Sequence, residues 1–206
     1  MLEVQSLRCS RGDRVLFQSL SFAVSPGSLL AVTGENGSGK TTLLRALCGL
    51  SPVDQGRISW QGQDVTTLAQ QYVTQVAYVG HRNALKDDLN AIENLQAITR
   101  LFGREIEYVA AREALDSVGL GRTFHLLETK LLSEGQKRRV ALARLWFCER
   151  PLWVLDEPFT ALDAQSSQLL RERMQRHLAH RGLLVIATHE DVGITTSAVH
   201  QLRLAG

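Results

Sequence analysis

The sequence predicts an α/β fold with a mostly parallel core sheet. Segments with strand and helix character alternate along the chain, which is the pattern of such folds. Residues 152–155 and 183–187 are apolar at every position, as in strands that are covered on both faces. The chain has 206 residues, of which 44% are apolar and 21% charged. This is enough for a domain with its own core and excludes a disordered chain.

The first third of the chain is expected to be rich in strands. Gly12-Asp13 and Pro26-Gly27 break it into segments, because glycine, proline and aspartate favour turns. The strands expected before the last core strands are residues 2–7, 16–24, 29–33, 58–60 and 76–79. A helix is expected at residues 40–50, with Leu43, Leu44, Leu47 and Leu50 on one face. Gly49 and Pro52 mark its end.

Strand signals disappear between residues 83 and 148. Helices are expected there at residues 92–102, 105–118 and 133–147. We therefore predict a single domain, residues 1–206, with a helical subdomain inserted at about residues 82–148. A further helix is expected at residues 165–180, with Leu170, Met174, His177 and Leu178 on one face.

Composition excludes several classes of protein. The formal net charge is +2, which argues against a strongly basic nucleic-acid-binding surface. The sequence has neither an apolar signal core at its start nor an apolar run of roughly 20 residues. Its three cysteines are widely spaced and form no metal-binding pattern, so we expect reduced, mostly buried thiols in a cytosolic protein: Cys9, Cys48 and Cys148.

The strongest motif is a phosphate-binding loop that fits G-x-x-x-x-G-K-[ST]. Glycines let backbone N–H groups turn toward a phosphate, and the following helix adds its free amides. Lys40 can reach the outer phosphates, and the Thr41 hydroxyl can bind Mg²⁺. The residues expected to hold the phosphates are Gly34, Glu35, Asn36, Gly37, Ser38, Gly39, Lys40, Thr41 and Thr42.

A second acidic site follows the apolar strand at residues 152–155. Asp156 and Glu157 come directly after it, and adjacent side chains at a strand end point in different directions. Asp156 is expected to hold Mg²⁺ together with Thr41. Glu157 is expected to act as the general base that activates a water.

A third motif indicates which class of phosphate-loop protein the chain resembles. Residues 132–136 read LSEGQ and resemble the LSGGQ signature of the ABC ATPases, with Glu134 in place of the first glycine. Residues 161–163 resemble that family's D-loop, and Thr188-His189 resembles its switch histidine. The resemblance runs from Leu2 to His189. It implies a P-loop NTPase fold with an N-terminal antiparallel β subdomain and a helical signature subdomain, and it implies ATP and Mg²⁺ as ligands.

The resemblance also implies a head-to-tail homodimer around two ATP molecules. Ser133, Gly135 and Gln136 would then act on the nucleotide held by the opposite chain. Asp163 would link the two sites, and His189 would position the γ-phosphate and the attacking water.

Two positions depart from the family pattern. Arg11 stands where an aromatic residue often stacks on adenine; a guanidinium can also stack on a base, but a solvated side chain is an equal alternative. His81 falls where the family has a glutamine that senses Mg²⁺ and phosphate. It is either a substitute for that catalytic group or a surface residue.

Residues 80–86, with the short chain and residues 159–163, resemble the ATP-binding subunits of cytochrome c maturation transporters, the haem exporters. This implies a peripheral protein on the cytoplasmic face of the bacterial inner membrane. Its expected partners are integral membrane subunits and, indirectly, a periplasmic haem chaperone, without nucleic acid. Residues 81–94 are the expected contact with the membrane subunits.

Three alternatives remain open at this point. The same ATPase could serve an exporter with another cargo. A soluble ABC ATPase acting on DNA or ribosomes is disfavoured, because it usually needs a long coiled-coil insertion or two ATPase domains. A module that binds ATP to organise partners with little turnover is disfavoured by the complete set of Asp156, Glu157 and His189.

Overall fold

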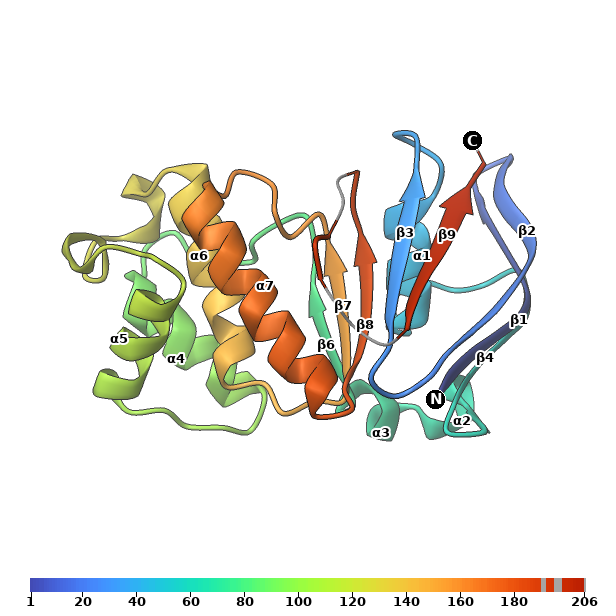
Figure 1. The fold of residues 1–206 in the computed structure, drawn as a ribbon, viewed down its shortest axis with the longest axis horizontal. Coiled ribbons are helices and arrows are strands. Elements are labelled where there is room, and N and C mark those ends of the chain that lie inside the picture. The colour runs from blue at the N-terminus through green and yellow to red at the C-terminus, as the bar shows by residue number, and fades with distance from the viewer. Residues whose placement is uncertain (190–191, 195–197, 206) are drawn as a thin grey trace. The chain divides into compact units, whose positions relative to one another are not determined.

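The computed structural model describes residues 1–189, 192–194 and 198–205, which fall into two compact units. Unit 1 comprises Met1–Gly80, Arg150–Glu157 and Gln175–Gly206, as far as those residues are described. Unit 2 comprises His81–Glu149 and Pro158–Met174. The chain passes between the units four times, at residues 80/81, 149/150, 157/158 and 174/175. The phosphate-binding loop belongs to unit 1 and the LSEGQ segment to unit 2 (Figure 1).

The core of unit 1 is a five-stranded sheet with the order β6-β7-β8-β3-β9, and every neighbouring pair is parallel. This confirms the predicted parallel sheet. Its strands are β3 (Leu29–Gly34), β6 (Val76–Val79), β7 (Leu152–Asp156), β8 (Leu183–Ala187) and β9 (Val199–Leu204). All residues of β7 and β8 are buried, as their apolar sequences require.

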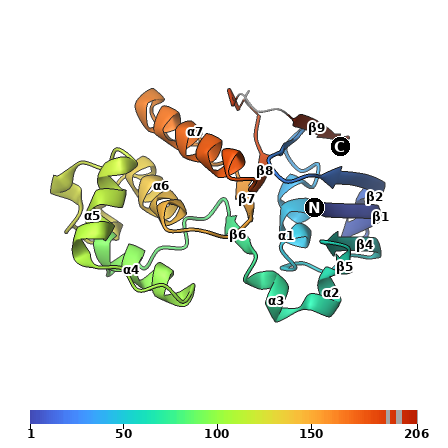
Figure 2. The same cartoon turned by 60° about the horizontal axis from the view of Figure 1, so that its bottom comes forward.

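A four-stranded antiparallel sheet forms the rest of unit 1, in the order β2-β1-β4-β5. Helix α1 (Lys40–Leu47) lies between the two sheets (Figure 2). Its buried leucines join both sheets in one hydrophobic core. The remaining elements are β1 (Leu2–Arg11), β2 (Arg14–Val24), β4 (Gln55–Trp60), β5 (Gln63–Asp64), α2 (Val65–Leu68) and α3 (Gln70–Val73).

Helix α1 ends earlier than predicted. Gly49 adopts a left-handed φ of 70°, and the Leu50 amide donates to the Arg45 carbonyl at 2.8 Å, which is a helix-terminating bond. Leu50 is consequently 49% exposed. The prediction that Leu50 shares the buried face of α1 is wrong, because the glycine turns the chain first.

Unit 2 has a separate helical core. Helices α4, α5 and α6 bury Ile92, Leu95, Leu115 and Val140 against one another. The predicted inward face of α7 is confirmed as buried. The elements of unit 2 are α4 (Ala91–Leu101), α5 (Tyr108–Ser117), α6 (Glu134–Ala143) and the 3₁₀ turns η1 (Arg122–Phe124), η2 (Thr129–Leu131) and η3 (Arg144–Trp146). Helix α7 (Ala164–Ala179) begins in unit 2, and its residues from Gln175 onward belong to unit 1.

The cysteine thiols are mostly buried, as expected. Cys9 and Cys48 are buried, and Cys148 is half-buried. Burial raises the pKa of the Cys9 thiol to about 11. Among the helices of the described residues, none combines the length and the apolar character that crossing a bilayer requires.

Candidate functional site: a phosphate loop, two acids and a capped helix

The phosphate-binding loop connects β3 to α1 through glycines that other residues could not replace. Gly34 has φ +146°, and a Cβ there would lie 2.7 Å from both the Leu204 carbonyl oxygen and Ser38 Oγ. Gly39 has φ +99° and precedes α1 without a side-chain cap. The first amides of α1 are therefore left for an external acceptor, as in a phosphate site.

Two polar groups line this loop from inside. The Lys40 ammonium donates to the carbonyl oxygens of Gly34 at 2.9 Å and Glu35 at 3.1 Å. Ser38 Oγ is buried and has no hydrogen-bond partner among the described residues. A buried hydroxyl donor in a glycine cradle suits an anionic oxygen, so the loop fits a nucleotide phosphate.

The predicted metal ligands come together although they are far apart in sequence. The Thr41 hydroxyl donates to Asp156 Oδ2 at 2.8 Å, and Asp156 is buried. Within the described residues, no group of three or more His, Cys, Asp or Glu side chains could hold a metal ion. Mg²⁺ usually binds one or two protein oxygens and completes its shell with phosphates and waters, so this oxygen pair fits it.

Glu157 turns away from its neighbour because of its backbone. Its φ is +49°, which is rare for a residue other than glycine, and its amide donates to the Ala187 carbonyl at 2.9 Å. Such strained conformations are concentrated at functional sites. Asp156 therefore faces Thr41, while Glu157 Oε1 lies 3.3 Å from His189 Nε2.

The imidazole of His189 contacts two charged groups through one nitrogen. Nε2 lies 3.2 Å from Lys40 Nζ and 3.3 Å from Glu157 Oε1. Nε2 can accept a hydrogen bond from Lys40 only when unprotonated, and can donate to Glu157 only when protonated. His189 thus lies between Lys40 of the phosphate-binding loop and Glu157. The protonation of Nε2 decides which of the two it bonds to.

The LSEGQ segment forms a capped helix start in unit 2, where Ser133 and Glu134 are exposed. Ser133 is the N-cap of α6, and its Oγ accepts a hydrogen bond from the Gln136 backbone amide at 3.3 Å. The Gln136 side chain returns this contact through Oε1, 2.8 Å from the Ser133 amide. Glu134 is exposed and pairs with Lys137 at 3.4 Å, one turn along the helix.

Gly135 is required by a close approach of two segments. A Cβ at Gly135 would lie 2.5 Å from the Ala161 carbonyl oxygen, closer than real contacts allow. Two residues further on, Asp163 accepts from the Ser166 amide at 2.8 Å and pairs with Arg139. The Ser166 amide, with help from Arg139, lowers the pKa of the Asp163 carboxyl.

The predicted site residues therefore fall into two groups. Unit 1 contains the phosphate-binding loop with Asp156, Glu157 and His189. Unit 2 contains Ser133, Gly135, Gln136 and Asp163. Arg11 is exposed at the end of β1, beside its hairpin partner Arg14, and His81 is exposed at the start of unit 2. The roles of Arg11 and His81 stay predictions.

Sequence reasoning missed two residues that support the loop. A Cβ at Gly39 would lie 3.1 Å from Leu16 Cβ and 3.2 Å from Phe17 Cδ1, so β2 packs directly against the loop. The apolar pattern of residues 16–24 indicated a strand. Only the tertiary fold shows which residues of that strand reach the loop.

Comparison with known proteins shows the family of the chain. The family model described as "ABC transporter" matches residues 17–160. The chain belongs to the ABC transporter family. A relative from Nitrosomonas europaea, named cytochrome c biogenesis ATP-binding export protein CcmA, is 47% identical over all of this chain and 96% of its own. The protein of that name from Escherichia coli K12 is 40% identical over 99% of this chain and 96% of its own.

Solved structures share the fold. A putative ABC transporter ATP-binding protein from Pyrococcus furiosus has a TM-score of 0.83, with 23% identity over 98% of this chain and 96% of its own. A dimeric ATP-binding cassette bound to ADP and Pi, in a post-hydrolysis state, has a TM-score of 0.80. Its identity is 21%, over 92% of this chain and 88% of its own.

Proposed function

We propose that this chain is the ATP-hydrolysing subunit of a membrane ABC complex that supports haem delivery for c-type cytochrome maturation. One structural observation carries the ATPase assignment: Thr41 pairs with Asp156 at 2.8 Å while the next residue, Glu157, faces His189. The maturation role rests on the relatives at 40–47% identity that match nearly the full chain.

The chemistry is the reaction of ATP with water to give ADP and phosphate. The loop from Gly34 to Thr42 holds the phosphates, and Lys40 leaves its carbonyl contacts to meet their outer oxygens. Thr41 and Asp156 would hold Mg²⁺, which would supply positive charge to the phosphate oxygens. Glu157 accepts a proton from the attacking water as the terminal phosphorus–oxygen bond breaks.

His189 controls the orientation of this base. When Nε2 carries a proton, it can hold Glu157 Oε1, which fixes the carboxylate for proton transfer. When a phosphate engages Lys40, the competing contact between Lys40 and His189 is released. Phosphate binding would thereby free His189 for Glu157 and for the γ-phosphate.

Unit 2 supplies the second half of the site in a head-to-tail homodimer. The exposed start of α6 presents Ser133 and free amides that suit a phosphate of the opposite chain. Asp163 would connect the two ATP sites. Arg11 would stack on the adenine, and His81 would approach the metal or the attacking water.

The expected partners lie at the membrane. The chain would bind, through residues 81–94, to integral membrane subunits at the cytoplasmic face of the bacterial inner membrane. A periplasmic haem chaperone would be reached only through them. In this arrangement residues 82–148 act as the signature subdomain inserted into the ATPase domain.

The role in cytochrome maturation is tested in the native host. Replacing the chromosomal gene by Glu157→Gln should abolish covalently bound haem in c-type cytochromes, because the variant lacks the general base but keeps the nucleotide site. Glu149→Gln is the matched control, since that carboxylate is exposed and pairs with Arg104. Haem-stained gels of membrane proteins give the readout.

Normal c-type cytochromes in the Glu157→Gln strain would contradict the proposal. If another envelope function failed while c-type cytochromes stayed intact, the ATPase would serve a different cargo.

A further inference from the structure

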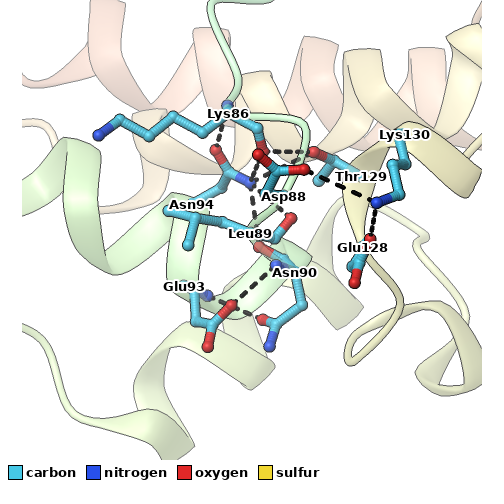
Figure 3. Close-up of polar contacts among 9 residues, drawn as sticks. All are labelled: Lys86, Asp88, Leu89, Asn90, Glu93, Asn94, Glu128, Thr129 and Lys130. Atoms are coloured by element: carbon cyan, nitrogen blue, oxygen red, sulfur yellow. Dashed lines mark hydrogen bonds and ion pairs between the residues drawn. The ribbon is translucent and has the colours of Figure 1, made fainter.

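Asn94 is a buried polar hub in unit 2 (Figure 3). Its Oδ1 accepts a hydrogen bond from the Lys86 amide at 2.8 Å. Its Nδ2 lies 3.0 Å from the carbonyl oxygens of Lys86 and Leu89, 3.1 Å from that of Asn90, and 3.4 Å from Thr129 Oγ1. One amide group thus fixes the course of the loop at residues 86–90.

Thr129 holds the same loop from the other side (Figure 3). Its side chain is fully buried, its hydroxyl donates to the Lys86 carbonyl at 2.7 Å, and its amide donates to the Leu89 carbonyl at 2.9 Å. Lys130 adds exposed contacts at the rim, with its amide on the Asp87 carbonyl and its ammonium near Asp88. The loop is therefore fastened to η2 by buried backbone and side-chain bonds.

Thr129 leads directly into the LSEGQ segment. Its carbonyl accepts from the Leu132 amide at 3.1 Å, and the Leu132 side chain is buried in the core of unit 2. Ser133 follows and caps α6. Hydrogen bonds therefore connect the loop at residues 86–90 through Thr129 to Leu132, the residue before the N-cap Ser133.

The hub consists of polar residues, which indicates that it fixes the position of the segments it joins. A buried polar network is costly unless every member is satisfied, and apolar residues of similar shape could fill the same space. Asn94 and Thr129 together constrain Lys86 and Leu89 at several atoms, which admits few alternative positions of η2. Such a network specifies one geometry rather than a range of them.

We infer that Asn94 and Thr129 are positioning residues that set the place of Ser133 and so control how well the signature of one chain engages the ATP of another. The inference rests on the proposed function, because it needs the head-to-tail dimer. Loosening the hub should weaken ATP-driven association while leaving nucleotide binding by each chain intact, since the phosphate-binding loop belongs to unit 1.

The test uses the full chain carrying Glu157→Gln, in which bound ATP should persist. Thr129→Val removes the buried hydroxyl at constant shape, and Thr129→Ser keeps it. Thr99→Val is the matched control, because Thr99 is also buried in unit 2 but bonds only to backbone carbonyls of its own helix. Light scattering during gel filtration measures dimer formation against ATP concentration, and a fluorescent ATP analogue measures binding.

Thr129→Val should raise the ATP concentration for half-maximal dimerisation by about tenfold, with analogue affinity changed by less than about twofold. Thr129→Ser and Thr99→Val should behave like the parent. Asn94→Asp should act like Thr129→Val, because a carboxylate cannot donate to the carbonyl oxygens, and it repeats the test if the valine variant does not fold.

Equal dimerisation by Thr129→Val and Thr99→Val would overturn the inference, because the hub would then be an ordinary stabilising contact. A parent that binds ATP but never dimerises would overturn the head-to-tail part of the proposed function, and this inference with it.

Discussion

At the residue scale, the contact between Thr41 and Asp156 supports the proposed Mg²⁺ site. They are separated by 115 positions in the chain, yet their oxygens lie 2.8 Å apart because β7 places Asp156 beside the first turn of α1. Both groups are hard oxygen donors, which is the ligand chemistry of Mg²⁺. Neither residue alone would indicate a metal site, whereas the pair does.

Thr41→Val is expected to raise the Mg²⁺ concentration needed for half-maximal ATP hydrolysis by about 10- to 100-fold, because valine keeps the shape and removes the ligand. Thr41→Ser retains the hydroxyl and should stay near the parent. Phosphate release measured over a Mg²⁺ titration checks this. Equal Mg²⁺ dependence of the valine and serine variants would contradict the assignment of Thr41.

At the element scale, the start of α6 explains why the fourth residue of the LSEGQ segment is a glycine. The helix begins with a reciprocal cap between Ser133 and Gln136, which fixes its first turn. That turn approaches the backbone of Ala161 so closely that Gly135 cannot carry a side chain. The signature and the D-loop region are thus held together within unit 2 by backbone contact.

Gly135→Ala should lower the free energy of unfolding by about 1–3 kcal/mol, because the added methyl meets the Ala161 carbonyl oxygen. Gly121→Ala is the control: its nearest neighbour would be a Phe124 ring atom at 3.5 Å, an ordinary contact. Thermal and urea unfolding measure both variants. If the Gly135→Ala and Gly121→Ala proteins were equally stable, the backbones at residues 135 and 161 could move apart without loss of stability. That result would contradict the requirement for glycine at position 135.

The sequence predicted some elements better than others for physical reasons. Strands β7 and β8 were predictable because a strand covered on both faces must be apolar throughout. Strand β9 was not predicted, because most of its residues are exposed and its sequence shows no apolar run. Gly49 and Pro52 marked the end of α1 only approximately, because the left-handed turn at Gly49 ends the helix before Leu50.

Some residues of the candidate site were likewise predictable from the sequence, and others were not. Lys40, Asp156 and Ser133 were predictable because their motifs are local, and each motif implies its own chemistry. The conformation of Glu157 and the support of Gly39 by β2 depend on segments distant in sequence. The hub at Asn94 joins α4 to η2, so no local motif could have indicated it.

At the scale of the whole molecule, the residues proposed for ATP hydrolysis and the residues proposed to contact the opposite chain's ATP belong to different units. Unit 1 holds the groups proposed to bind and cleave ATP, and unit 2 holds the helix start at Ser133 that is proposed to contact a phosphate of the opposite chain. In the proposed head-to-tail dimer, a second copy of the chain would complete each ATP site. The proposed membrane subunits would use the energy of ATP hydrolysis. The proposed function therefore depends on assembly of the dimer and the membrane complex as much as on catalysis.

The most direct test is to purify the tagged Glu157→Gln chain from native membranes with ATP present and to identify its partners by mass spectrometry. The variant should retain the closed dimer, because it binds ATP without cleaving it. We expect small integral membrane subunits together with a haem chaperone. A different permease would contradict the role in cytochrome maturation, and only soluble partners would contradict the membrane complex itself.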